Sequence, residues 1–285
     1  MVECGGGEDR NMTRKNWSRE ETILAFDLYC KMPFGKIHHS HPEIIKLAKL
    51  IDREPSAVAM KMLNLASHDP EQQKRGIKGL QHGSKLEGII WAEFQNDWES
   101  LAYESKAILA NIKNEDIAVV ANIDLNNLPS GMDKNRLVKQ RIGQNFFRSA
   151  VLNAYECRCC ITGIAIDTLL VASHIKPWKL SDEKTERTNP TNGLCLNALH
   201  DKAFDQGLIS INQKFEIMVS DELKHNHCVE TTQKWFVSFE GKPIEIPHKF
   251  LPDRRFIEYH NDMVFQTCEK NILKQSNQKK WNKIF

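Results

Sequence analysis

Three side chains that could carry acid–base or metal chemistry lie close together in the sequence: His174, Asn192 and His200. An apolar run precedes His174, turn residues fill the interval, and a second apolar piece at 193–196 leads to a helix that opens near His200. An imidazole can take up a proton near neutral pH or bind a metal ion. The pattern therefore predicts a strand at 168–172, a polar loop, a second strand and a helix, with a metal-dependent site among them.

Residues 17–110 are predicted to form a helical domain. Ser18 precedes acidic residues, as at a helix N-cap, and Pro42 opens a further helix. A third helix follows a short turn and carries Lys61 and Asn64, which is the order of a helix-turn-helix module that places its last helix in the major groove of DNA. A small helical packing domain has the same pattern, so DNA contact by Lys61 and Asn64 is one of two interpretations.

Basic residues gather in several places, although the net charge of the chain is only +2. The loop 74–85 interleaves cations with glycines, and a basic amphipathic helix starts at Lys134. Lysine and arginine dominate phosphate binding because they displace counterions. The remaining candidate DNA-binding residues are Arg75, Lys78, Lys85, Arg141, Arg148 and Lys176. Solvated surface with no ligand is the alternative interpretation.

The chain is expected to be α+β, with a linker between two domains. The predicted parts are a flexible N-terminus (1–16), the helical recognition domain (17–110), a linker (111–133), a second domain (134–265) and a basic tail (266–285). Beyond the helix near His200, the sequence predicts a hairpin at 207–219, a last strand at 242–247 and a helix after Leu251.

Composition excludes several classes of protein. The chain is 41% hydrophobic and 27% charged, as in globular domains, and it contains no apolar run of the roughly 18 residues that a membrane span needs. The N-terminus has no apolar core of the kind that marks a secretory signal. We therefore expect a cytoplasmic protein whose eight cysteines are reduced.

The motifs from Tyr155 onward resemble those of the HNH endonucleases. The resemblance rests on Tyr155, Cys159, Thr162 and Gly163, followed by Ser-His-Ile-x-Pro-Trp at 173–178 and by Asn-Gly-Leu at 192–194. It covers about residues 136–265, and it implies a C-terminal ββα-metal nuclease domain.

The resemblance also implies roles for individual residues. His174 corresponds to the general base, Asn192 to the residue that fixes the loop orienting it, and His200 to a metal ligand on the helix. Many HNH enzymes carry Asp or His before the base, where this chain has Ser173. The alternatives for completing the metal site are Ser173, Asp201 and Asp205, and the choice between His200 and Asp201 stays open because the register is uncertain by one residue. The implied cation is Mg²⁺ first, with Mn²⁺ or another transition metal as the alternative.

The cysteines do not favour structural zinc. Cys157 and Cys160 have the spacing of one Cys-x-x-Cys pair, but Cys195 has no partner at that spacing. Cys159 is instead predicted to be a buried packing thiol.

The predicted function is a divalent-metal-dependent DNA endonuclease of bacterial restriction or defence, with target selection, for example of methylated cytosine, by the N-terminal domain. Double-stranded DNA is the expected partner. A homodimer is a further expectation, because one such site cuts one strand. Two alternatives remain: a catalytically decayed DNA-binding regulator, and a nuclease recruited by a partner protein.

Overall fold

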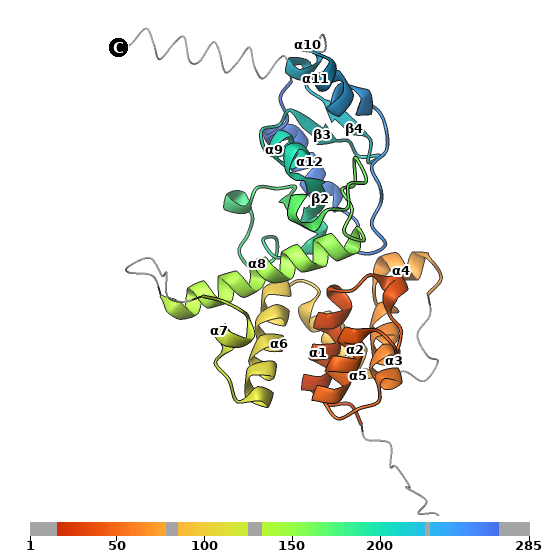
Figure 1. The fold of residues 1–285 in the computed structure, drawn as a ribbon, viewed down its shortest axis with the longest axis vertical. Coiled ribbons are helices and arrows are strands. Elements are labelled where there is room, and N and C mark those ends of the chain that lie inside the picture. The colour runs from red at the N-terminus through yellow and green to blue at the C-terminus, as the bar shows by residue number, and fades with distance from the viewer. Residues whose placement is uncertain (1–15, 78–84, 125–132, 226–228, 268–285) are drawn as a thin grey trace, which may run out of the picture.

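The computed structural model describes residues 16–77, 85–124, 133–225 and 229–267. Residues 1–15, Lys78 and residues 268–285, where a flexible start, a DNA contact and a basic tail were predicted, lie outside these ranges. The first part of the described chain is helical (Figure 1). Its elements are α1 (Arg19–Cys30), η1 (Phe34–Lys36), α2 (Pro42–Leu50), α3 (Pro55–Ala66), α4 (Pro70–Lys74), α5 (Lys85–Phe94), α6 (Trp98–Lys113), α7 (Ile117–Val120) and α8 (Lys134–Ala154).

The helix-starting residues predicted from the sequence lie at the starts of α1 and α2. Ser18 caps α1, and its side chain and that of Glu21 bond reciprocally to each other's backbone N–H groups in a capping box. Pro42 occupies the first turn of α2, where its missing N–H costs nothing. α1 lies at the centre of this region and packs against α3, α5 and α6. None of the described helices is long and apolar enough to cross a membrane.

The two residues of α3 that were predicted to contact DNA are buried. Lys61 is 3% exposed and its Nζ lies 2.6 Å from a carboxylate oxygen of Glu87 on α5. Asn64 is also buried. Neither side chain is therefore exposed to solvent in this arrangement, and contact of Lys61 and Asn64 with DNA stays a prediction.

The second part of the described chain contains two small antiparallel sheets with helices around them. Its elements are η2 (Asp167–Leu169), β1 (Leu170–His174), η3 (Trp178–Leu180), η4 (Pro190–Asn192), β2 (Gly193–Asn197), α9 (Ala198–Asp205), β3 (Ile209–Ile211), β4 (Ile217–Val219), α10 (Asp221–His225), α11 (Glu230–Trp235), η5 (Val237–Phe239) and α12 (Arg254–Met263). The predicted α+β fold, with a helical N-terminal region and a ββα unit, is confirmed.

Two predicted strands differ from the structure. The first strand is β1, two residues later than expected, so that His174 is its last residue and residues 167–169 form a 3₁₀ turn. Residues 242–247 do not form a strand and make one isolated bridge between Glu216 and Pro243, since Pro243 and Pro247 limit ladder hydrogen bonding.

The hairpin of β1 and β2 lies between α8 and α9. His174 pairs with Gly193 and Ser173 with Leu194, so neighbouring residues of β1 face opposite sides of the sheet. The face of His174 and Gly193 packs on α8, and the other face meets α9. A Cβ at Gly193 would lie 2.4 Å from Val151 Cγ2 and 2.9 Å from Phe147 Cζ.

This contact makes Gly193→Ala a test of the packing. We expect the substitution to lower the free energy of unfolding by about 1–3 kcal/mol, because overpacking forces side chains or backbone to shift. Urea denaturation of the full chain measures it. Gly35→Ala is the matched control, since nothing lies within 4 Å of a Cβ at that position. Equal unfolding midpoints for the two variants would contradict the packing described here.

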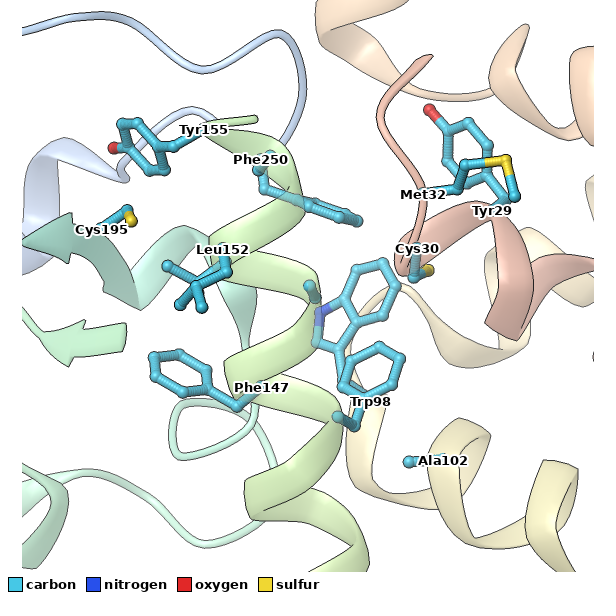
Figure 2. Packing of buried hydrophobic residues seen from close by; sticks show 14 of the residues in the cluster. Tyr29, Cys30, Met32, Trp98, Ala102, Phe147, Leu152, Tyr155, Cys195 and Phe250 are labelled. Atoms are coloured by element: carbon cyan, nitrogen blue, oxygen red, sulfur yellow. The ribbon is translucent and has the colours of Figure 1, made fainter. Parts of the chain in front are cut away.

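α8 contributes to the packing of both parts of the chain. Figure 2 shows Trp98 and Phe250 on one side of α8, with Phe147 and Cys195 on the other. The described part of the predicted linker contains the end of α6 and α7, which packs on α6. Lys249, fully buried, donates from Nζ to the backbone oxygens of Tyr29 and Met32 at the end of α1. The helical part and the sheet part are therefore in direct contact, and the boundary drawn at 111–133 remains a prediction.

Candidate active site

Asn192 holds the loop between β1 and β2 in place. Its side chain is fully buried: Oδ1 accepts the Lys176 N–H at 2.8 Å, and Nδ2 lies 3.2 Å from the Lys176 oxygen and 3.3 Å from the Glu186 oxygen. The Asn192 oxygen also accepts the N–H of Ile175 at 2.9 Å. One amide thus joins both ends of the loop, which fits the predicted orienting role.

His174 is fixed at the end of β1 by three contacts. Its ring stacks on Phe147 of α8 with centroids 3.8 Å apart and planes 13° apart, and it meets Trp178 edge to face at 5.4 Å. Its Nε2 lies 2.8 Å from the backbone oxygen of Arg187. A carbonyl oxygen only accepts hydrogen bonds, so Nε2 carries the proton and Nδ1 keeps its lone pair.

The surroundings of His174 favour the neutral ring. Burial lowers the pKa of His174 to about 4, and the hydrogen bond to Arg187 opposes this only in part. At neutral pH the imidazole is therefore unprotonated, with Nδ1 ready to accept a proton. Sequence reasoning missed the parts played by Phe147 and Arg187, because one acts by ring packing and the other through a backbone carbonyl.

The opposite face of β1 carries an oxygen-rich cluster. Asp201 and Asp205 lie four residues apart on α9 and so share one helix face. Burial raises the pKa of both carboxyl groups, and the negative charge of Asp201 raises the pKa of Asp205 further. The Ser173 hydroxyl faces Asp201 and lowers its pKa, but Ser173 Oγ is buried without a partner of hydrogen-bond geometry among the described residues.

His200 has a different environment from its neighbour Asp201. It is 1% exposed; its Nδ1 lies 2.8 Å from Asn197 Nδ2 and its Nε2 lies 2.7 Å from the backbone oxygen of Trp235. Phe236 and Phe239 contact the ring edge to face. Both nitrogens are engaged inside the protein, so the structure does not support the predicted ligand role of His200 and favours Asp201.

A comparison with known families identifies this arrangement. Residues 159–212 match the sequence model of a family described as HNH endonuclease. This segment is an HNH endonuclease domain. No curated protein gives a significant match to the chain. The match contains β1, β2 and α9 with His174, Asn192 and Asp201, so the predicted resemblance is confirmed. An HNH endonuclease domain indicates nuclease activity on DNA.

The oxygen-rich cluster in the HNH domain fits a hard divalent cation, which HNH nucleases typically use. Mg²⁺ is commonly held by one or two carboxylates, with water and substrate phosphate completing its shell. The buried, unpartnered Ser173 Oγ and the two carboxylates with raised pKa are groups that such a cation would satisfy. Among the described residues, no three His, Cys, Asp or Glu side chains are grouped as a metal site.

The predicted DNA-binding cations differ in exposure and in their distance along the chain from the HNH domain. Arg141 and Arg148 are exposed on α8, and Arg148 lines the same groove as His174. Lys176 is tied into the loop by a 2.5 Å contact with Glu186. Arg75 and Lys85 are exposed in the helical part. Arg148 is therefore the exposed cation of this set that lies beside His174.

Cys159 is buried, as predicted, but it has polar neighbours. Its Sγ lies 3.5 Å from Asn197 Nδ2. Burial raises the pKa of Cys159, but the neighbouring His200 side chain and the side chain and backbone of Thr162 outweigh burial and lower the pKa to about 6. These contacts link the start of the HNH domain to the N-cap of α9.

Proposed function

We propose that this protein is a divalent-metal-dependent DNA endonuclease in which His174 is the general base. The observation that carries the proposal is the 2.8 Å contact of His174 Nε2 with the Arg187 oxygen, which leaves the Nδ1 lone pair free. In the proposed reaction Nδ1 removes a proton from water, the water oxygen bonds to phosphorus, and the P–O bond to the leaving oxygen breaks. The Arg187 carbonyl keeps the ring in place while it carries the extra proton.

We assign Asp201, Asp205 and Ser173 to the cation, with Mg²⁺ as the first choice and Mn²⁺ as the alternative. When bound, the cation would neutralise charge that develops on the phosphate and the leaving oxygen. β1 pairs with β2 on one edge only in the described sheet. A phosphodiester bound along the unpaired edge of β1 would contact His174 on one face of the sheet and Ser173 and Asp201 on the other.

The biological role is proposed from this chemistry and the domain order. We propose a cytoplasmic bacterial restriction or defence enzyme acting on double-stranded DNA. The helical region would select the target, for example a methylated cytosine, and two copies would be needed to cut both strands. Arg75, Lys85, Arg141 and Arg148 are the exposed cations that we propose for DNA contact, and Asn192 is proposed to orient the loop around His174.

A metal-dependence assay tests the nuclease proposal. The full chain is expected to nick supercoiled plasmid in Mg²⁺ or Mn²⁺, to lose this activity when EDTA is in excess, and to regain it when metal is restored. Methylated and unmethylated plasmids measure target choice. DNA binding without cleavage in any divalent metal would overturn the proposal and favour the DNA-binding regulator.

A further inference from the structure

A groove of about 380 Å³ lies beside His174, between α8 and β1. His174 is one of its lining residues and Arg148 is the cation among them. The others are Gln144, Phe147, Val171, Ala172 and Trp178. The groove therefore combines an apolar and aromatic surface with one guanidinium and one amide.

The aromatic rings of this groove already pack against other side chains of the protein. Phe147 is 3% exposed and stacks on His174, and Trp178 contacts His174 while the Arg187 guanidinium lies 5.4 Å from the centre of its ring. A nucleobase needs a free ring face for stacking. The groove is thus poorly suited to a stacked base, and its polar groups suit the sugar and phosphate of a DNA backbone.

The exposed stripe of α8 extends this surface. Arg141, Gln144 and Arg148 stand at positions i, i+3 and i+7, which lie on one helix face. At 1.5 Å of rise per residue the two arginines are about 10 Å apart along the helix axis, more than the roughly 3.4 Å of axial rise per phosphate on one DNA strand. They can therefore reach different phosphates of one strand.

The Arg148 guanidinium is bonded to the start of β1, and much of the side chain remains exposed to solvent. Its Nη1 donates to the Leu170 oxygen at the start of β1 at 2.9 Å, and Asp167 Oδ1 lies 3.9 Å from Nη2. The side chain is 44% exposed. A guanidinium has five N–H donors in a planar fork that matches phosphate, so this contact leaves donors for a ligand.

We propose that the groove binds the sugar–phosphate backbone of the strand to be cut, with Arg148 as the residue that positions the phosphate next to His174 and Arg141 on a further phosphate. The inference rests on the proposed function, because it takes His174 as the base. Backbone contacts carry no sequence information, so binding by this groove is independent of sequence and selectivity arises elsewhere in the protein.

The test measures DNA binding by the full chain in EDTA, where cleavage is blocked. Fluorescence anisotropy with two duplexes of unrelated sequence gives the affinity at several salt concentrations. Arg148→Ala and Arg141→Ala should each reduce the slope of log affinity against log salt by about 0.9, the value for one lost phosphate contact, and equally for both duplexes. Arg148→Lys should keep most of the slope. Lys214→Ala, which removes an exposed charge from the β3–β4 turn, is the control and should not change it.

The outcomes separate this inference from the nuclease proposal. An unchanged slope in Arg148→Ala, even with a lower thermal midpoint, would show that Arg148 only supports β1, and would overturn the inference. A loss that depends on duplex sequence would overturn it as well. Absence of cleavage by the wild-type chain in Mg²⁺ and Mn²⁺ would instead overturn the nuclease proposal, while the slopes would still report on the groove.

Discussion

His174→Ala is expected to reduce the rate of DNA cleavage by about 10²- to 10⁴-fold, the usual contribution of a positioned general base. The remaining groups still bind DNA and metal, so the affinity for a duplex in EDTA should stay near that of the wild type. Plasmid nicking in Mg²⁺ or Mn²⁺ measures the loss. Undiminished cleavage by the variant would remove His174 from the mechanism.

The pH dependence of the wild-type enzyme gives a second check on His174. The base is active when unprotonated, so activity is lost as pH falls through its pKa. Because burial lowers that pKa to about 4, His174 should leave kcat/KM unchanged between pH 8 and 5 and reduce it only near pH 4. A loss centred near the ordinary histidine pKa of about 6.5 would contradict the buried, stacked environment described here.

Asp201→Asn is expected to raise the Mg²⁺ or Mn²⁺ concentration for half-maximal cleavage by on the order of 100-fold. Two unit charges 4 Å apart at an effective dielectric constant near 20 interact by about 4 kcal/mol, part of which is lost to desolvation, and about 1.4 kcal/mol corresponds to tenfold. Isothermal titration of Mn²⁺ into the metal-free protein measures binding separately from activity. Asp205→Asn should act in the same direction.

His200→Gln is the matched comparison for the metal assignment. His200 is buried and engaged through both ring nitrogens, so the variant should have a lower thermal midpoint but an unchanged metal requirement in the folded protein. If His200→Gln weakens Mn²⁺ binding and Asp201→Asn does not, the ligand is His200 and our assignment is wrong.

The sequence alone determined the parts of the HNH domain that depend on chain order and local signals. A strand just before His174, an Asn-Gly turn before the second strand and a following helix were readable because hydrophobic periodicity and turn residues act over short distances. The bounds of the first strand were predicted two residues too early. The same holds for the capping box that starts α1. The places of His174 and Asn192 could therefore be predicted from the chain, and their roles as base and loop-orienting residue were implied by the resemblance to the HNH endonucleases.

Only the tertiary structure decided which side chains face each other. Consecutive residues on a helix point about 100° apart, so His200 and Asp201 have different neighbours although they are adjacent in the sequence. Asp201 faces Ser173, whereas His200 is buried beside Trp235. Likewise, α5 buries Lys61 of α3, a long-range packing that no local pattern shows. The charge and spacing of these residues can be read from the sequence, but their burial and their bonding partners depend on segments that are distant in the chain.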